Sequence, residues 1–208
     1  MVRVTDTGSA LAWLSDRPAH EASTGYAPEG WAADTWVLPI VHERRRRGAR
    51  WRRVTWASYL ARPGNESTVR SVPPCFRWFE HPVMSPTVRW PEDGTLDPET
   101  FASLIDVLAR SAPGPEPVEC VAFWGRLAVP HQDGDRDELW TGPLSALPDL
   151  VQANGGPYRS TPTNFWAHDR SWFVWSDHDL MGTRVSGSLA LVDAVRGHPE
   201  LETVTWPG

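Results

Sequence analysis

The chain has 208 residues, of which 40% are hydrophobic and 22% are charged, a balance that lets one hydrophobic core form. The net charge of -6 excludes a protein whose whole surface binds polyanions, although a local basic patch is compatible with it. No secretory signal begins the sequence, and no stretch reaches the roughly eighteen apolar residues of a membrane span. We therefore expect a single globular domain over residues 1–208, located in the cytoplasm.

Prolines and glycines divide the first half of the sequence into short predicted elements. A short helix is expected over residues 9–14, and an apolar strand is expected over residues 36–41. Pro39 lacks the backbone N–H that a central strand needs, so this strand is placed at a sheet edge. One or two helical turns follow over residues 55–62, and the proline-rich residues 63–94 are expected to be mostly irregular.

Residues 98–110 give the clearest helix signal in the sequence. Asp97 is a favourable N-cap, Pro98 suits the first helical position, and apolar residues recur at helical spacing before the stop at Pro113. Residues 118–129 form a nearly continuous apolar run, which is typical of a central strand that is covered on both faces. We therefore place this second segment at the heart of the sheet.

The C-terminal part of the chain mixes short strands and helices without a regular βαβ alternation. This order favours an α+β fold in which helices pack on a largely antiparallel sheet. A helix over residues 189–196 has Ser188 as its N-cap and ends at Gly197. The other predicted elements are a strand over residues 139–141, a helix over residues 146–153, paired strands over residues 171–176 and 183–186, and a final strand over residues 202–206.

An arginine-rich run between residues 42 and 53 points most directly to a charged partner. Guanidinium groups bind phosphate in a bidentate manner, and interleaved indoles can stack on a base or pack at a protein interface. A solvated turn, or pairing with acidic residues elsewhere in the chain, is the alternative interpretation. The candidate binding residues in this run are Arg44, Arg45, Arg46, Arg47 and Trp51.

Histidines and carboxylates gather between residues 164 and 179. Such groups can act as acid and base or as ligands of a divalent metal. Adjacent strand residues point to opposite faces, however, so few of these groups can converge on one ion, and no metal ligand is assigned. A polar hairpin turn is the competing interpretation. The candidate binding residues are Trp166, His168, Asp169, Asp177 and His178, with Trp172 and Trp175 as further walls of a pocket.

Other motifs that carry chemistry are missing from the sequence. No Gly-x-Ser-x-Gly elbow supplies a placed nucleophile, and neither the dinucleotide-binding nor the P-loop pattern occurs. Cys75 and Cys120 have no metal-ligand spacing, and both are interpreted as buried, reduced thiols. No cofactor is therefore expected, and whether the chain is an enzyme stays open.

The C-terminal segment resembles part of a tryptophan-rich family of actinobacterial proteins of similar size. The resemblance runs from Asn164 to Trp172, through residues 176–180 and 183–188, to residues 199–202, and it continues weakly upstream. No activity is established for that family, so the resemblance implies a compact family domain and no catalytic residue. In size, acidity and order of elements, the chain is also similar to small immunity and adaptor proteins that neutralise bacterial toxins.

Three functions follow from these features, in a definite order. The first is a non-enzymatic protein, possibly of the immunity or adaptor kind, that binds another macromolecule with tryptophans and arginines on one face. The second is a small enzyme or ligand-binding domain with a tryptophan-lined His/Asp pocket around residues 164–179. The third is nucleic-acid binding through residues 44–53, which the acidic net charge disfavours. A protein partner is expected rather than nucleic acid or a membrane, and the oligomeric state stays open.

Overall fold

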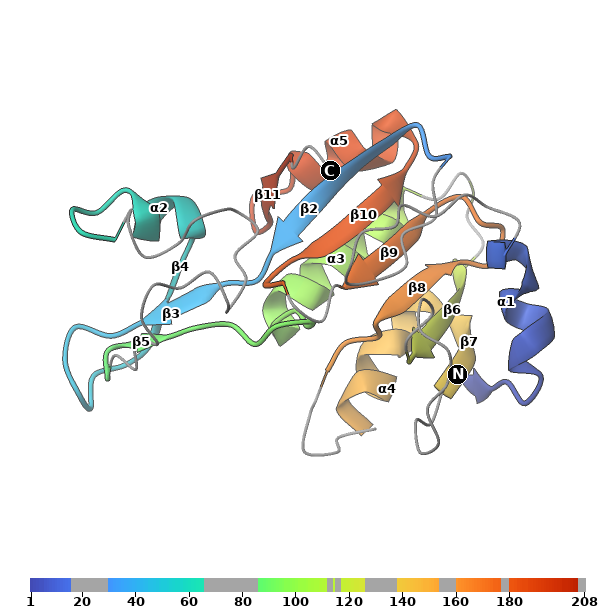
Figure 1. Ribbon diagram of the computed structural model, residues 1–208, viewed down its shortest axis with the longest axis horizontal. Helices are drawn as coiled ribbons and strands as arrows, with labels where there is room; N and C mark the ends of the chain where they lie inside the picture. Colours follow the sequence, from blue (N-terminus) through green and yellow to red (C-terminus); the bar gives the residue numbers. More distant parts are fainter. Residues whose placement is uncertain are drawn as a thin grey trace.

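The fold is mixed α+β, as predicted, and is built on an antiparallel sheet. The computed structural model describes residues 1–15, 30–65, 86–111, 114, 117–125, 138–153, 160–176 and 180–205. Within these ranges the chain forms a main sheet of eight strands and a smaller sheet of three strands (Figure 1).

The main sheet brings together strands from both ends of the sequence. Each neighbouring pair that the structure describes is antiparallel. In spatial order the strands are β1 (Val2–Arg3), β7 (Glu138–Pro143), β6 (Glu119–Trp124), β8 (Asn164–Ala167), β9 (Phe173–Ser176), β10 (Thr183–Gly187), β2 (Ala33–Leu38) and β11 (Glu202–Val204).

Helices cover the two faces of the main sheet unequally. Three of them, α3 (Pro98–Arg110), α4 (Leu147–Ala153) and α5 (Leu189–Arg196), pack on one face, which we call the helix face, and a short 3-10 turn (Leu144–Ala146) precedes α4. The remaining helix of the body, α1 (Thr7–Ser15), packs on the opposite face. Because strand residues alternate in direction, the central strands β6, β8 and β9 each supply side chains to the hydrophobic clusters on both faces.

A smaller unit, which we call the arm, extends beyond one end of the main sheet (Figure 1). It comprises residues 39–65 and 86–90, which contain β3 (Val41–Glu43), β4 (Arg52–Val54), α2 (Trp56–Leu60) and β5 (Val88–Arg89). The strands pair in the order β4-β3-β5. A separate hydrophobic cluster around Trp56 and Tyr59 packs the arm together and reaches Met181 of the body.

Most of the predicted elements are confirmed, and two predictions need correction. The helices at residues 98–110 and 189–196 form with the predicted caps, Asp97 and Ser188. The edge position of the strand near Pro39 is wrong, because β2 pairs with β10 on one side and β11 on the other. This strand ends at Leu38, one residue before the proline, so the missing N–H never falls within the ladder. Trp124, which belongs to the apolar run expected at the heart of the sheet, is only half-buried.

The thiol of Cys120 is free and buried, as the sequence predicts, whereas Cys75 lies outside the described ranges. Burial, together with the neighbouring Glu119 carboxylate, raises the pKa of the Cys120 thiol to about 12. The group is therefore protonated at neutral pH and is not a nucleophile. None of the described helices is long and apolar enough to cross a membrane.

Candidate functional site

Positive charge is concentrated in the arm. All twenty basic residues of the chain are arginines, and residues 39–65 contain eight of them with a single acidic residue. This segment therefore has a formal charge of +7, whereas the remaining residues together have -13. This segment of the arm is thus opposite in the sign of its formal charge to the rest of the chain.

The tip of the arm comprises residues 45–50 of the connection between β3 and β4, together with Arg52 at the start of β4. Most of the predicted arginine run lies here, in a turn that places Gly48 at a φ of 84°. In the described part of the chain, no acidic side chain pairs with the arginines of the tip that are exposed. These are Arg45, Arg46, Arg47, Arg50 and Arg52.

Arg44 and Trp51 have a structural role beside the tip. The Arg44 guanidinium lies 4.4 Å from the centre of the Trp51 ring, and the Arg89 guanidinium lies 4.8 Å from it. Arg44 Nε also donates a hydrogen bond of 2.7 Å to the carbonyl of Pro86. Such cation–π contacts hold the half-buried indole against the two guanidinium groups, and they occupy the ring that the sequence offered as a stacking surface.

Within the arm, Glu43 and Arg62 form a partly buried ion pair. The carboxylate of Glu43 is almost fully buried, and both of its oxygens accept from Arg62 Nη1, one of them at 2.6 Å. This contact raises the pKa of the Arg62 guanidinium above its ordinary value. Glu43, the one acidic residue of the arm, is thus paired with Arg62, and it does not neutralise the arginines at the tip.

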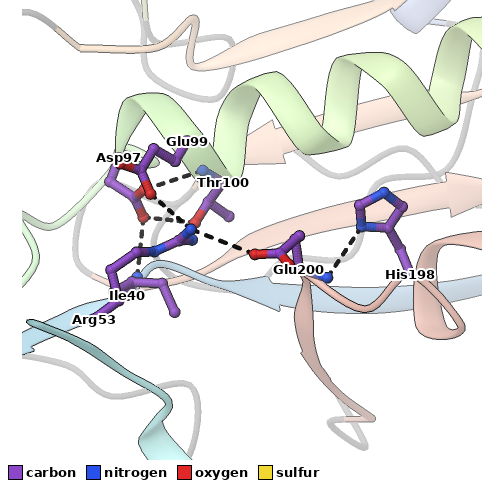
Figure 2. Close-up of polar contacts among 7 residues, drawn as sticks. All are labelled: Ile40, Arg53, Asp97, Glu99, Thr100, His198 and Glu200. Carbon is purple, nitrogen blue, oxygen red and sulfur yellow. Dashed lines mark hydrogen bonds and ion pairs between the residues drawn. The ribbon is translucent and has the colours of Figure 1, made fainter.

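A polar network joins the arm to the body (Figure 2). The Asp97 carboxylate caps α3 by accepting from the Thr100 N–H at 3.0 Å, and it also accepts from the Thr100 hydroxyl at 2.6 Å. Its second oxygen accepts from the Ile40 N–H, at 3.0 Å, where β2 leads into the arm. One carboxylate therefore fixes the start of α3 and the entry to the arm together.

Arg53 continues this network from β4. Its Nη1 lies 2.6 Å from a carboxylate oxygen of Glu99 on α3 and 3.5 Å from one of Glu200 before β11. The backbone N–H of Glu200 in turn donates to Nδ1 of His198, at 3.3 Å (Figure 2). Of the arginines in the run, Arg53 is thus the one that holds the arm to the acidic body.

Glu202 of β11 holds the N-terminus of α2. Its two carboxylate oxygens accept from the backbone N–H groups of Trp56 and Ala57, at 2.6 and 2.7 Å. Burial raises the pKa of Glu202 above its ordinary value of 4.5, and the two N–H donors oppose this shift. The sequence gives no local signal for this contact, because 146 residues separate Glu202 from Trp56.

This contact leads to a prediction about pH. Because the pKa of Glu202 is higher in the folded chain than in the unfolded one, the folded chain holds this proton more tightly between the two values. The resulting stabilisation is complete below the unfolded pKa and is lost as the pH rises through the folded pKa. The free energy of unfolding of the wild type should therefore fall with pH relative to that of Glu202→Gln, measured by denaturant titration from acidic to neutral pH. If the free energy of unfolding of the wild type stayed constant or rose with pH relative to that of Glu202→Gln, this assignment would be contradicted.

A cavity of about 620 Å³ brings some of the predicted His/Asp residues together at another place. It lies at the end of the helix face, where the turn between β8 and β9 meets the end of α3 and the start of α5. His168, Asp169 and Trp172 contribute to its lining, as do Glu119, Ser188 and Leu191.

The other residues of the predicted pocket do not join this cavity. Trp166 and Trp175 belong to the hydrophobic cluster on the opposite face of the sheet, whereas Trp172 belongs to the cluster on the helix face. Asp177 and His178 lie outside the residues that the structure describes. Within the described ranges, no group of three or more His, Cys, Asp and Glu side chains could hold a metal ion.

No protein family, curated protein or solved structure matches the chain. The function therefore has to be inferred from the two features that the geometry defines, the basic tip of the arm and the cavity on the helix face.

Proposed function

We propose that the chain is a non-enzymatic binding protein whose arm docks on an acidic surface of another protein. The observation that carries this proposal is the set of exposed arginines at the tip, Arg45, Arg46, Arg47, Arg50 and Arg52, which have no acidic partner among the described residues. Arginine is enriched at the centres of protein interfaces, where its guanidinium binds carboxylates in a bidentate manner. An immunity or adaptor role, in which a small protein covers a surface of another, fits this mode of binding.

Two observations favour a protein partner over nucleic acid. A nucleic acid that ran from the tip towards the body would be repelled there, because residues outside 39–65 have a formal charge of -13. In addition, the indole of Trp51 is already covered by Arg44 and Arg89, so it is not available to stack on a base. A compact acidic patch needs only the tip, and an arginine fork recognises carboxylates without a stacked base.

The arm and the body are held together firmly enough to present the tip in one orientation. Asp97, Arg53 and Glu202 each join the arm to α3 or β11 through contacts of 2.6–3.0 Å. A binding surface on a fixed scaffold loses less conformational entropy when it meets its partner. The contacts of Asp97, Arg53 and Glu202 therefore support binding through the arm, although these residues do not themselves contact the partner in this proposal.

Changing Arg45, Arg46 and Arg47 to glutamine is expected to weaken binding of an acidic partner by about tenfold or more, since each exposed guanidinium–carboxylate pair contributes up to about 1 kcal/mol. The probes are a polyglutamate peptide and a single-stranded DNA of equal charge, whose affinities are compared by fluorescence anisotropy near physiological salt. The matched control changes three exposed or half-exposed arginines of the body, Arg3, Arg110 and Arg196, to glutamine.

The outcomes of this experiment separate the candidate functions. Polyglutamate binding that is lost in the arm variant and kept in the control supports the proposal. Stronger binding of the DNA would move the assignment to nucleic acid, and equal loss in both variants would show that net charge, not the tip, is responsible. The same variants, used in affinity capture from the native lysate, would then identify the partner as one whose recovery depends on the tip.

A second candidate function is the binding of a small ligand in the cavity on the helix face. One observation favours it: the cavity gathers His168, Asp169 and Trp172 from the segment that the sequence singled out. Its volume lies in the range of about 300–1,000 Å³ that is usual for sites of small organic ligands. Neither His168 nor Asp169 makes a side-chain hydrogen bond to a nucleophile among the described residues, so we assign binding and no catalysis.

A further inference from the structure

One wall of the cavity is the turn between β8 and β9, and backbone hydrogen bonds fix this turn at the end of the main sheet. The His168 N–H donates to the carbonyl of Glu119 at 2.9 Å, which ties the β8–β9 turn to the start of β6. The Ala167 N–H donates to the carbonyl of Trp172 at 3.3 Å and closes the turn. The turn that forms one side of the cavity is therefore held in place, as a preformed binding site requires.

Close packing lies directly behind one wall. A Cβ atom on Gly187, at the end of β10, would approach Leu191 Cδ2 to 2.7 Å and Trp172 Cβ to 3.3 Å. A side chain at this position would therefore push the Trp172 and Leu191 side chains away from β10. With glycine, the two apolar side chains stay against the sheet and the space in front of them is left open to a ligand.

Negative charge dominates the rim of the cavity. Glu119 and Asp169 both line it and are exposed, and no ion pair joins either carboxylate to a basic residue in the described part of the chain. One oxygen of Asp169 accepts from the Ser171 N–H at 2.9 Å, which orients the carboxylate within the turn. No arginine is among the lining residues that the structure describes.

Two described basic side chains that neighbour the lining residues in the sequence are engaged elsewhere. Arg170, in the same turn, adopts a left-handed conformation with a φ of 62°, and its guanidinium lies 5.0 Å from the ring of Trp13. Trp13 packs on the opposite face of the sheet, so this charge points away from the cavity. Arg110, at the end of α3, pairs with Asp106 at 2.7 Å.

The two helix ends at the cavity do not change this balance. Ser111 ends α3, where the helix dipole places about half a negative charge, and Ser188 begins α5, where it places about half a positive charge. These partial charges are opposite and of similar size. The carboxylates of Glu119 and Asp169 therefore decide the sign of the site.

From this arrangement we infer that the cavity binds a small organic cation with an apolar body, of the class of alkyl or arylalkyl amines. The ammonium group meets the carboxylates of Glu119 and Asp169 at the rim, while the hydrocarbon part lies against Trp172, Leu191 and Val118. This inference rests on the second candidate function, and it names the charge and shape of the ligand that this site takes.

The test compares three probes of nearly equal size that differ in charge. They are 2-phenylethylamine as the cation, 2-phenylethanol as the neutral analogue and 3-phenylpropanoate as the anion. Binding is followed by shifts of assigned backbone amide signals in the NMR spectrum of the full chain. We expect the amine to bind about fivefold more tightly than the alcohol, the gain typical of a partly exposed ion pair, and the anion to bind most weakly. The shifts should fall on His168, Ser171 and Leu191.

Single variants then test the two carboxylates. Glu119→Gln and Asp169→Asn should each reduce the preference for the amine over the alcohol, whereas Asp149→Asn, an exposed carboxylate on α4 outside the cavity, should leave it unchanged. The amide spectrum of each variant also reports whether it is folded. Binding of the alcohol without any preference for the amine would overturn the inference and leave a ligand site standing. No shift at the cavity with any probe would overturn both.

Discussion

Phe165→Ala is expected to lower the free energy of unfolding by about 3–5 kcal/mol, the usual loss when a buried aromatic ring is deleted. Phe165 is 1% exposed in the central strand β8. Its ring makes edge-to-face contacts with Phe101 of α3 and with Trp172, with ring centres 5.9 Å apart in both cases. Deletion of this ring therefore removes the contact through which α3 packs on the middle of the sheet. Denaturant titration followed by far-UV circular dichroism measures the change.

Two further variants make this prediction specific. Phe165→Leu keeps most of the buried volume and should cost about 1 kcal/mol. Val2→Ala removes an apolar side chain that is 70% exposed, and it should have almost no effect on the unfolding midpoint. A loss of less than about 1 kcal/mol for Phe165→Ala would mean that the helix face closes over the gap, and that the ring is not central to the core.

The sequence was sufficient to predict an element where the residues that specify the element lie within it or a few positions away. Helix α3 begins at Pro98 after an Asp97 cap, and α5 begins at Leu189 after a Ser188 cap. In both, the cap side chain accepts from a backbone N–H three residues along, a contact that the sequence alone defines. Apolar spacing then gave the buried face of each helix, since it needs no knowledge of the partner.

Elements that depend on distant partners could not be predicted in the same way. The strand β8 has four residues, all of them buried on both faces of the sheet, so it shows no polar alternation from which a strand could be recognised. The position of β2 between β10 and β11 is likewise set by residues about 150 or more positions away. Pro39 suggested an edge because a sequence pattern does not show which residue the ladder ends on.

The candidate sites also combine features that the local sequence predicted with contacts that depend on distant residues. The arginine run predicted a charged turn, but its members have different partners: Arg53 binds Glu99 of α3, Arg44 covers Trp51, and Arg45 to Arg47 are exposed. The His/Asp segment predicted one pocket, yet alternation along β8 sends Trp166 to the opposite face, whereas His168 lies in the turn after the strand and reaches the cavity on the helix face. Composition identified the residues, and pairing of the strands decided which of them meet.

Trp56 is the largest fully buried side chain that the structure describes in the arm. Trp56 is 1% exposed, its Nε1 donates to the carbonyl of Pro39 at 2.8 Å, and its ring stacks on Trp90 with the ring centres 5.5 Å apart. It also packs with Leu38 of β2 and Met181 of the body. The same residue thus fills the core of the arm and attaches the arm to the main sheet.

Trp56→Ala is therefore expected to open the arm while the body stays folded. The loss of about 3–5 kcal/mol falls on a hydrophobic cluster that is separate from those on the two faces of the main sheet. In hydrogen exchange, the amides of β3 and β4 should lose protection by about a hundredfold or more, whereas those of β6 and β8 should keep it. Trp56→Ala should also weaken binding of the polyglutamate probe, because the tip is no longer presented in one orientation.

Two conservative variants separate the role of the ring from that of its N–H group. Trp56→Phe keeps an aromatic ring on Trp90 but removes the hydrogen bond to Pro39, and it should reduce protection of the arm by about tenfold. Trp140→Phe, in β7, removes an indole N–H that has no hydrogen-bond partner within the described chain, so it loses no such bond and should leave the arm unchanged. If Trp56→Ala lowered protection equally in β6 and β3, the arm and the body would unfold as one unit. The orientation of the basic tip would then depend on the whole fold and not on Trp56 and the contacts of Asp97, Arg53 and Glu202.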